Sequence, residues 1–149
     1  MKKSNPTIAQ LNELLAINYE AEKMYLEALK QVESEELKHF FRAMAFERNE
    51  FCRFLGAEII QKGGKPEYSD QEKNGLAKLW GKFKKGVSNK DENVLFNEVC
   101  RIKTWSLEKY NTILDKIKHS EGITQLLKKQ RDTLERSLHS IQIGDRLIA

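Results

Sequence analysis

The strongest constraint on the fold is a repeat of apolar residues at alternating steps of three and four along the chain. The first stretch of this repeat runs through Leu11, Leu15, Asn18, Glu22, Tyr25, Leu29 and Val32. Such spacing puts these side chains on one face of an α-helix, and that face then packs against a neighbouring helix. The polar residues Asn18 and Glu22 lie near the middle of the stretch. The pattern predicts a long helix whose buried face is polar halfway along.

Three further stretches show the same kind of repeat. They are Phe40, Met44, Glu47, Phe51 and Phe54; then Val94, Leu95, Glu98, Ile102, Trp105, Ile113 and Ile117; and then Leu127, Gln130, Leu134, Leu138, Ile141 and Ile148. Residues typical of helix ends occur at Asn5-Pro6, Ser34, Gly63-Gly64 and Ser120, and the third long helix is expected from about Lys90 to Lys118. The chain of 149 residues contains only 2 Pro and 8 Gly, which is too few for a turn-rich β-sandwich or β-barrel. We therefore expect an all-α fold, with residues 1–149 forming a single domain.

The lengths of the connections predict how the helices are arranged. About three residues join the first long helix to the second, and the third to the fourth, so each pair should be antiparallel. The connection between the second and third is much longer, and the capping-box sequence Ser69-Asp70-Gln71-Glu72 opens a short amphipathic helix within it. At about 1.5 Å per helical residue, this connection can return the chain to the other end of the bundle. The expected architecture is therefore a four-helix bundle with a long crossover that contains a short extra helix.

Titratable residues lie at a similar depth in all four long helices, on the buried faces of the first three and on the flank of the buried face of the fourth. Counted at about 1.5 Å per residue from the ends of the helices, four of them fall within a slab of roughly 5 Å, and two more lie about one turn away. The candidates are Glu22, Glu47, Glu98 and His139, with Glu50 and Glu135 one turn away. Carboxylates that meet in a dry interior repel one another unless protons, bases or metal cations lie between them.

Three interpretations of this layer stay open at this point. The acids are ligands of a metal, members of a degenerate polar layer, or solvated and salt-bridged surface positions that pair with basic residues nearby. The basic residues that are adjacent in sequence are Lys23, Arg48, Arg101 and Lys103. Tyr19, Tyr25 and Tyr110 are expected to be core residues whose hydroxyl groups reach a partner.

Three segments carry a resemblance to known proteins. They are LNELLAINYEAEKMYLEAL (residues 11–29), IQKGGKPE (residues 60–67) and the crossover helix that contains Trp80. Through these segments nearly the whole chain resembles the ferritin-like superfamily, and within it a rubrerythrin-related bacterial family of four-helix bundles of unknown function. The resemblance implies a carboxylate-bridged centre of two iron or two manganese ions inside the bundle.

The ligand pattern of that superfamily is a Glu on one helix and Glu-x-x-His on the next, given twice. The residues that the resemblance matches to it are Glu22 and Glu47-x-x-Glu50 in the first half, and Glu98 and Glu135-x-x-x-His139 in the second. A carboxylate thus replaces the first histidine, and the second histidine lies one residue too far along. A half-site made only of carboxylates favours harder metal ions.

These observations lead to two main functional hypotheses. The first is a metal-binding or metal-sensing bundle with iron or manganese, connected to oxidative or general stress. The second is a metal-free structural or interaction protein that forms a homodimer through one bundle face and keeps only a degenerate metal site. Whether the chain is an enzyme stays open, because no motif identifies a catalytic residue or an organic cofactor.

Composition narrows the remaining classes of partner. Nucleic-acid or anion binding by the lysine-rich crossover, residues 62–90, is the least favoured hypothesis, because this segment contains no arginine and its aromatic residues lie on the apolar face. The apolar runs are far shorter than the roughly 20 residues of a membrane span. Cys52 and Cys100 lie outside any CxxC spacing, and the polar residues near the N-terminus argue against a signal peptide. We therefore expect a cytoplasmic protein without membrane contact.

Overall fold

A computed structural model describes residues 5–69, 76–116 and 120–144. Its helices are α1 (Pro6–Gln31), α2 (Glu35–Gln61), α3 (Leu76–Asn89), α4 (Glu92–Lys116) and α5 (Glu121–Gln142). The part of the chain that the structure describes contains no strand. The predicted all-α class is therefore confirmed.

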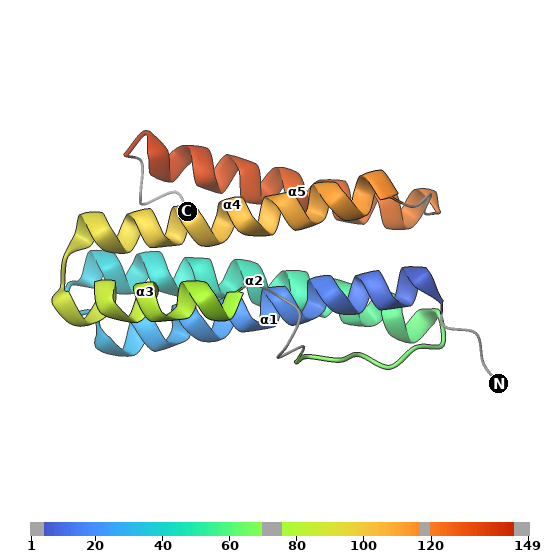
Figure 1. Ribbon diagram of the computed structural model, residues 1–149, viewed down its shortest axis with the longest axis horizontal. Helices are drawn as coiled ribbons and strands as arrows, with labels where there is room; N and C mark the ends of the chain where they lie inside the picture. Colours follow the sequence, from blue (N-terminus) through green and yellow to red (C-terminus); the bar gives the residue numbers. More distant parts are fainter. Residues whose placement is uncertain (1–4, 70–75, 117–119, 145–149) are drawn as a thin grey trace.

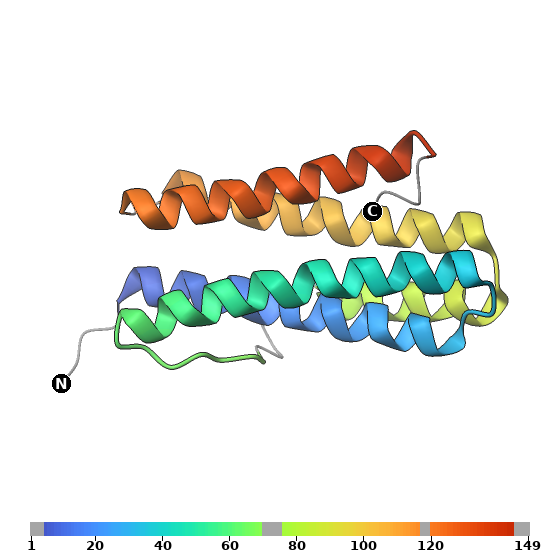
Figure 2. The same cartoon turned by 180° about the vertical axis from the view of Figure 1, so that it is seen from behind.

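The four long helices lie side by side, and α3 runs along one side of them (Figure 1). α1 and α2 form one antiparallel pair, and α4 and α5 form the other, with α5 lying beside α2 (Figure 2). After α2 the chain returns along the bundle, so that α4 starts at the end where α1 and α2 are joined (Figure 1). α4 therefore runs parallel to α2, which is the crossover arrangement that the connection lengths predict.

Side-chain caps fix the starts of α1, α2, α4 and α5. The side chain of Asn5 accepts hydrogen bonds from the backbone N–H groups of Thr7 and Ile8 at the start of α1. Ser34, Asp91 and Ser120 accept from backbone N–H groups in the first turns of α2, α4 and α5. Each cap satisfies backbone donors that the first turn of a helix leaves without a partner. The capping box predicted for α3 extends into residues 70–75, which lie outside the described residues.

The returning segment after α2 is attached to α1. The side-chain amide of Asn12 donates to the backbone oxygen of Lys65 at 3.1 Å, and its Oδ1 accepts from the backbone N–H of Glu67 at 2.7 Å. The rings of Tyr19 and Tyr68 meet edge to face, with centroids 5.2 Å apart. These contacts hold the crossover against the bundle before it reaches α3.

The buried apolar residues form two clusters, one toward each end of the bundle. The first is rich in aromatic residues, and α3 contributes Phe83 to it, which meets Tyr25 and Phe41 edge to face. Trp80 packs against this cluster from α3. The second cluster is mainly aliphatic and includes Leu55 and Leu127. Polar side chains fill the space between the two clusters.

Two residues that the apolar repeat places on buried faces are exposed. Phe54 is 55% exposed and Val94 is 41% exposed. A strict seven-residue repeat drifts by about 20° per heptad relative to a straight helix, so the buried face of α2 passes from Phe51 to Leu55 and Ile59 and leaves Phe54 outside. Ile117 and Ile148, also expected on such faces, lie outside the described residues.

Candidate functional site

A layer of polar side chains crosses the middle of the bundle and draws on all four long helices. Its fully or almost fully buried members are Asn18 on α1, Arg48 on α2, Lys103, Ser106 and Tyr110 on α4, and Gln130 on α5. Buried polar groups destabilise a fold unless they are hydrogen-bonded, so the partners of each group decide what the layer can do.

One part of the layer is a neutral hydrogen-bond chain. The Tyr110 hydroxyl donates to Oε1 of Gln130 at 2.6 Å and accepts from Nδ2 of Asn18 at 2.9 Å. Nδ2 of Asn18 also donates to the backbone oxygen of Leu14 at 2.8 Å, and Nε2 of Gln130 donates to the backbone oxygen of Phe51 at 3.3 Å. These hydrogen bonds connect α1, α2, α4 and α5. The side chains of Asn18, Tyr110 and Gln130 each have a partner.

Arg48 is hydrogen-bonded to this neutral network and brings a buried positive charge to it. Its Nη1 donates to Oδ1 of Asn18 at 2.9 Å and to Oγ of Ser106 at 3.1 Å, and Oγ of Ser106 donates to the backbone oxygen of Ile102 at 2.9 Å. Arg48 is 0% exposed, and among the described residues its Nε and Nη2 have no hydrogen-bond partner. Within the same described residues no carboxylate forms an ion pair with it. The guanidinium group is thus only half satisfied.

Lys103 is the second cation of the layer. Its Nζ donates to Oε1 of Glu47 at 3.1 Å, in an ion pair whose side chains are 0% and 12% exposed. Burial lowers the pKa of Lys103, and the positive charge of Arg48 lowers it further, whereas Glu47 opposes both effects. The structure therefore brings two cations and one carboxylate together where the sequence predicts an excess of acids.

The tyrosine and cysteine side chains near the layer are held in their protonated forms. Burial raises the pKa of Tyr25 to about 12, partly offset by the Arg48 charge, and burial also raises the pKa of Tyr110. Burial raises the pKa of Cys52 to about 12, so its thiol is a poor nucleophile at neutral pH. Cys52 and Cys100 pack against the two apolar clusters, as expected of small hydrophobic residues.

Most of the acids on α1, α2 and α4 that are predicted to be metal ligands form hydrogen bonds or ion pairs with other side chains. Oε2 of Glu22 accepts from Nδ2 of Asn49 at 3.0 Å, and Glu47 pairs with Lys103. Oε1 of Glu50 accepts from Nη1 of Arg53 at 2.7 Å. The remaining acid, Glu98, is 6% exposed; its Oε1 lies 3.4 Å from Nε of Arg101 and makes no hydrogen bond.

The two predicted ligands on α5 lie elsewhere. Glu135 and His139 are exposed, and the buried face of α5 is formed by Leu134, Ser137 and Ile141 instead. Within residues 5–69, 76–116 and 120–144, no three His, Cys, Asp or Glu side chains form a group that could hold a metal ion. The side chains near the acids, Arg48 and Lys103, are cations, so this donor set does not fit a di-metal centre.

From the sequence, Arg48 and Lys103 are expected only as neighbours that pair with acids, and their burial is not predicted. A signal for burial was present. Arg48 lies seven residues from both Phe41 and Leu55, and Lys103 lies seven residues from both Phe96 and Tyr110. All four of these neighbours are buried. A basic residue between two such positions shares their face of the helix.

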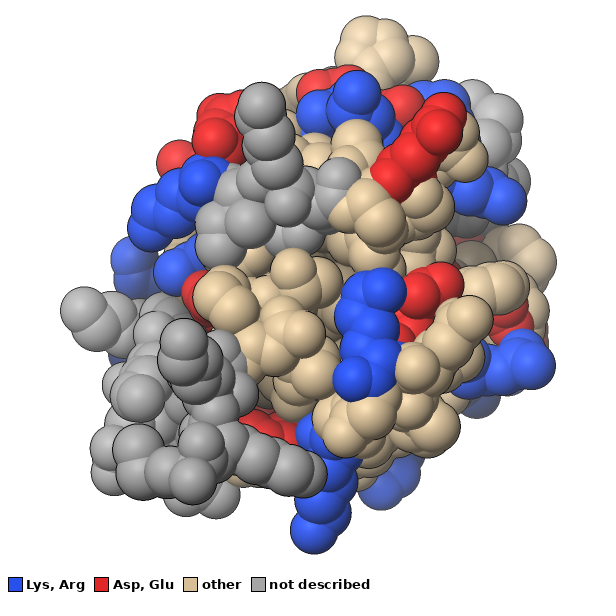
Figure 3. All heavy atoms as spheres, turned by 90° about the vertical axis from the view of Figure 1, so that its right-hand side faces the viewer, with Lys and Arg blue, Asp and Glu red and all other residues tan. Residues whose placement is uncertain are grey.

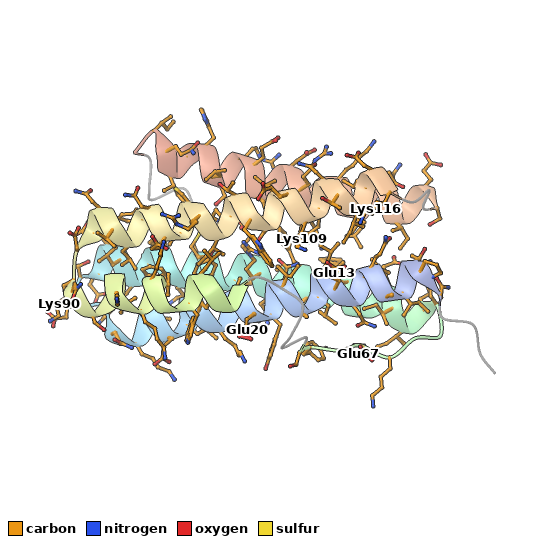
Figure 4. All side chains as sticks on the ribbon, in the orientation of Figure 1. Glu13, Glu20, Glu67, Lys90, Lys109 and Lys116 are labelled. Atoms are coloured by element: carbon orange, nitrogen blue, oxygen red, sulfur yellow. The ribbon has the colours of Figure 1, made fainter. Side chains whose placement is uncertain are left out.

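Charged residues outside the layer are mixed in sign. Glu13 on α1 faces Lys109 on α4, with Oε2 and Nζ 3.6 Å apart (Figure 4). Among the described residues at the end of the bundle where α1 begins, Lys and Arg side chains lie beside Asp and Glu side chains around a central area of uncharged residues (Figure 3). In the described ranges, no helix is long and apolar enough to cross a membrane.

Comparison with known proteins places the chain in a family. No curated protein and no solved structure matches the chain. A family model described as a domain of unknown function, DUF2383, matches residues 6–116, which extend from the start of α1 to the end of α4. Because the match covers more than half of the 149 residues, the chain belongs to the DUF2383 family.

Proposed function

We propose that this chain is a metal-free interaction bundle, with side-chain cations in the place where a ferritin-like bundle would carry a di-metal centre. The observation that supports the proposal is the burial of Arg48 and Lys103 beside the central acids. A metal cation bound there would face two positive side chains, and Glu47 already pairs with Lys103. Coulomb repulsion between like charges is strong in a dry interior, so the site favours an anion over a cation.

Metal content tests the first half of this proposal. The untagged protein is purified without chelators, and its iron, manganese and zinc are measured by elemental analysis. We expect well under one equivalent of each metal per chain. The double variant Glu22→Ala, Glu47→Ala is the matched comparison, because a true metal centre would lose its metal in this variant. One or two equivalents that disappear in the double variant would contradict the proposal.

The outer face of α2 supports the second half, an interaction role. Phe46 is 64% exposed, Phe54 is 55% exposed and Ile60 is 63% exposed. Among the helices that the structure describes, none covers this side of α2 (Figure 2). Exposed large apolar side chains gathered on one face are typical of surfaces that bind another protein. Phe46 and Ile60 lie about 21 Å apart along the helix axis, a span that suits a helix-to-helix contact.

The partner that we propose for this face is a second copy of the chain. The face carries charges of both signs, with Glu50 and Arg53 between the apolar residues. Two copies therefore meet without a net charge repulsion, and a two-fold interface uses the same patch on both subunits. A groove of about 250 Å³ between α2 and α5 adjoins the face and is lined by Phe51, Phe54 and Leu126.

Sedimentation velocity over a range of protein concentrations tests this dimer. We expect a dimer for the unaltered protein and a monomer for the double variant Phe46→Glu, Ile60→Glu. Leu26→Glu is the matched control, because Leu26 is an apolar residue that is 40% exposed on α1, away from the face. A monomer at all concentrations, or a dimer that the double variant leaves intact, would contradict the α2 interface.

A further inference from the structure

We infer that the unpaired edge of Arg48, together with the hydroxyl of Tyr25, is a binding site inside the bundle for a small carboxylate ligand. This inference goes beyond the proposed function and does not depend on self-association. It starts from the half of the Arg48 guanidinium that has no acceptor among the described residues.

The free half of Arg48 has a specific geometry. Its two contacts with Asn18 and Ser106 both use Nη1. The atoms left without a partner are Nε and Nη2. These two nitrogens form one side of the planar guanidinium, and their N–H bonds point in nearly the same direction. Two parallel donors of this kind match the two oxygens of a carboxylate, which is the usual bidentate pairing of arginine.

A second unpaired group lies beside this edge. Tyr25 is 0% exposed, and its ring centroid lies 6.0 Å from Cζ of Arg48. Burial raises the pKa of the Tyr25 hydroxyl and Arg48 lowers it by donating toward its oxygen, but among the described residues no well-aligned hydrogen bond forms and the hydroxyl proton has no acceptor. A buried tyrosine hydroxyl normally finds a partner. As a donor, this hydroxyl can add a third hydrogen bond to an acceptor held by Arg48.

The register of α4 and α5 brings a third unpaired group to a nearby level. Tyr110 and Gln130 are in contact, and the two helices are antiparallel, so Ser137 on α5 lies level with Lys103 on α4. Within the part of the chain that the structure describes, Oγ of Ser137 is also buried without a hydrogen-bond partner. Unpaired groups on α1, α2 and α5 thus occur in one zone of the bundle.

The charges around Arg48 indicate whether the ligand at its unpaired edge is neutral or an anion. Arg48 and Lys103 carry two positive charges, and Glu47 is the carboxylate that contacts one of them. A fully buried guanidinium without a counter-ion is strongly destabilised, and a bound anion removes that cost. Water would supply an acceptor but no charge. A small carboxylate supplies two acceptors in the right geometry together with the missing negative charge.

The test uses formate, the smallest carboxylate, as the probe. The side-chain Nε–H signals of the arginines are followed by NMR in ¹⁵N-labelled protein while formate is added at constant ionic strength. Nitrate has the same planar pair of oxygens, whereas chloride has not. We expect formate and nitrate to move the Arg48 signal in a saturable way, and chloride to move it much less. Because the edge is enclosed, each sample is equilibrated until the signal stops changing.

Two variants and one control variant show whether the NMR response to formate comes from the proposed site. Arg48→Lys keeps the charge but removes the bidentate edge, and we expect saturable binding to be lost. Tyr25→Phe keeps the packing and removes the hydroxyl, and we expect formate to bind about tenfold more weakly, as for the loss of one hydrogen bond to a charged group. Arg53→Lys is the matched control, because Arg53 lies on the outside of the same helix, and it should change nothing.

The inference is overturned if the Arg48 signal does not respond to formate, or if its only detectable contact is with water. It is equally overturned if Arg48→Lys binds formate as well as the unaltered protein does. If Arg48→Lys does not fold, Tyr25→Phe provides the test alone. An affinity for formate that is unchanged in Tyr25→Phe would show that the Tyr25 hydroxyl does not bind the ligand, and would overturn the proposed site.

Discussion

The polar layer has two parts that differ in how completely their groups are paired. In the neutral part, Asn18, Tyr110 and Gln130 give one another donors and acceptors across the bundle. In the charged part, Arg48 keeps two nitrogens without a partner, and Lys103 has one partly exposed carboxylate. A fully paired buried network adds to the stability and uniqueness of a fold, whereas a partly paired one costs free energy. The neutral part is therefore suited to holding the helices in register, and the charged part to binding.

The largest expected effect comes from Asn18, the residue at which the two parts meet. Asn18→Leu removes an acceptor from Arg48 and a donor from the Tyr110 hydroxyl at once. We expect a loss of about 3–5 kcal/mol in the free energy of unfolding, because a buried charge is left with one acceptor fewer. Urea denaturation followed by circular dichroism measures it. A loss below about 1 kcal/mol would mean that the two parts are independent.

The ion pair between Glu47 and Lys103 gives the next largest effect. Glu47→Leu leaves the ammonium group of Lys103 buried without a partner, and we expect a cost of about 2–4 kcal/mol. The double variant Glu47→Leu, Lys103→Met removes both charges and should recover most of that loss, or exceed the unaltered protein in stability. A double-mutant cycle by urea denaturation measures the coupling. A double variant that is no more stable than Glu47→Leu alone would contradict the expected cost of the unpaired ammonium group, and one well below the unaltered protein would show that the pair is a net stabilising contact.

Tyr110→Phe tests the neutral part alone. The change removes the donor to Gln130 and leaves Oε1 of Gln130 buried without a partner, while Asn18 keeps its bond to Leu14. We expect a loss of about 1–3 kcal/mol in the free energy of unfolding. Adding Gln130→Leu should recover part of it, because the stranded amide is removed. The same denaturation assay checks both variants.

Alkaline pH provides a smaller, graded effect. Burial raises the pKa of Cys52 from 9.0 to about 12 and that of Tyr25 from 10.0 to about 12. The folded protein thus keeps protons that the unfolded chain releases, so stability is full below pH 9 and falls as the pH rises from about 9 toward 12. The slope is about 1 kcal/mol per pH unit for each group. Cys52→Ala should delay the fall, and thermal unfolding between pH 7 and pH 11 detects it.

The smallest effect is expected outside the layer. Glu50 and Arg53 form an ion pair at 2.7 Å, with side chains that are 29% and 70% exposed. Exposed pairs contribute little, so Arg53→Ala should change the free energy of unfolding by less than about 0.5 kcal/mol. A larger loss would show that charge at the surface matters as much as charge in the interior.

The sequence predicts the helical architecture well because its signals are local. The apolar repeats, the caps at Asn5, Ser34 and Ser120, and the connection lengths lead to the observed helices and to the parallel direction of α2 and α4. These features depend on residues close together in the chain. The residues that the repeat misplaces, such as Phe54, lie at the edge of a helix face, where a small angular drift moves a side chain outward.

The content of the polar layer is harder to predict. The depth count brings Glu47 to the layer, yet it cannot say that Lys103 and not a metal will neutralise it. His139 shows the other difficulty, because its depth is plausible but its direction is outward. Which charge faces which depends on the rotation of each helix about its own axis, and packing across the whole bundle sets that rotation.

The contact between Gly64 and the start of α1 has a consequence for the lengths of the first two helices. A Cβ atom at position 64 would lie 2.7 Å from Cγ2 of Ile8, so the chain leaving α2 touches the beginning of α1 more closely than a side chain permits. The three-residue link between Gln31 and Glu35 fixes the opposite end of the same hairpin. An insertion or deletion in one helix would therefore separate Asn18 from Arg48 unless the other helix changed by a matching amount, and relatives should vary these two lengths together.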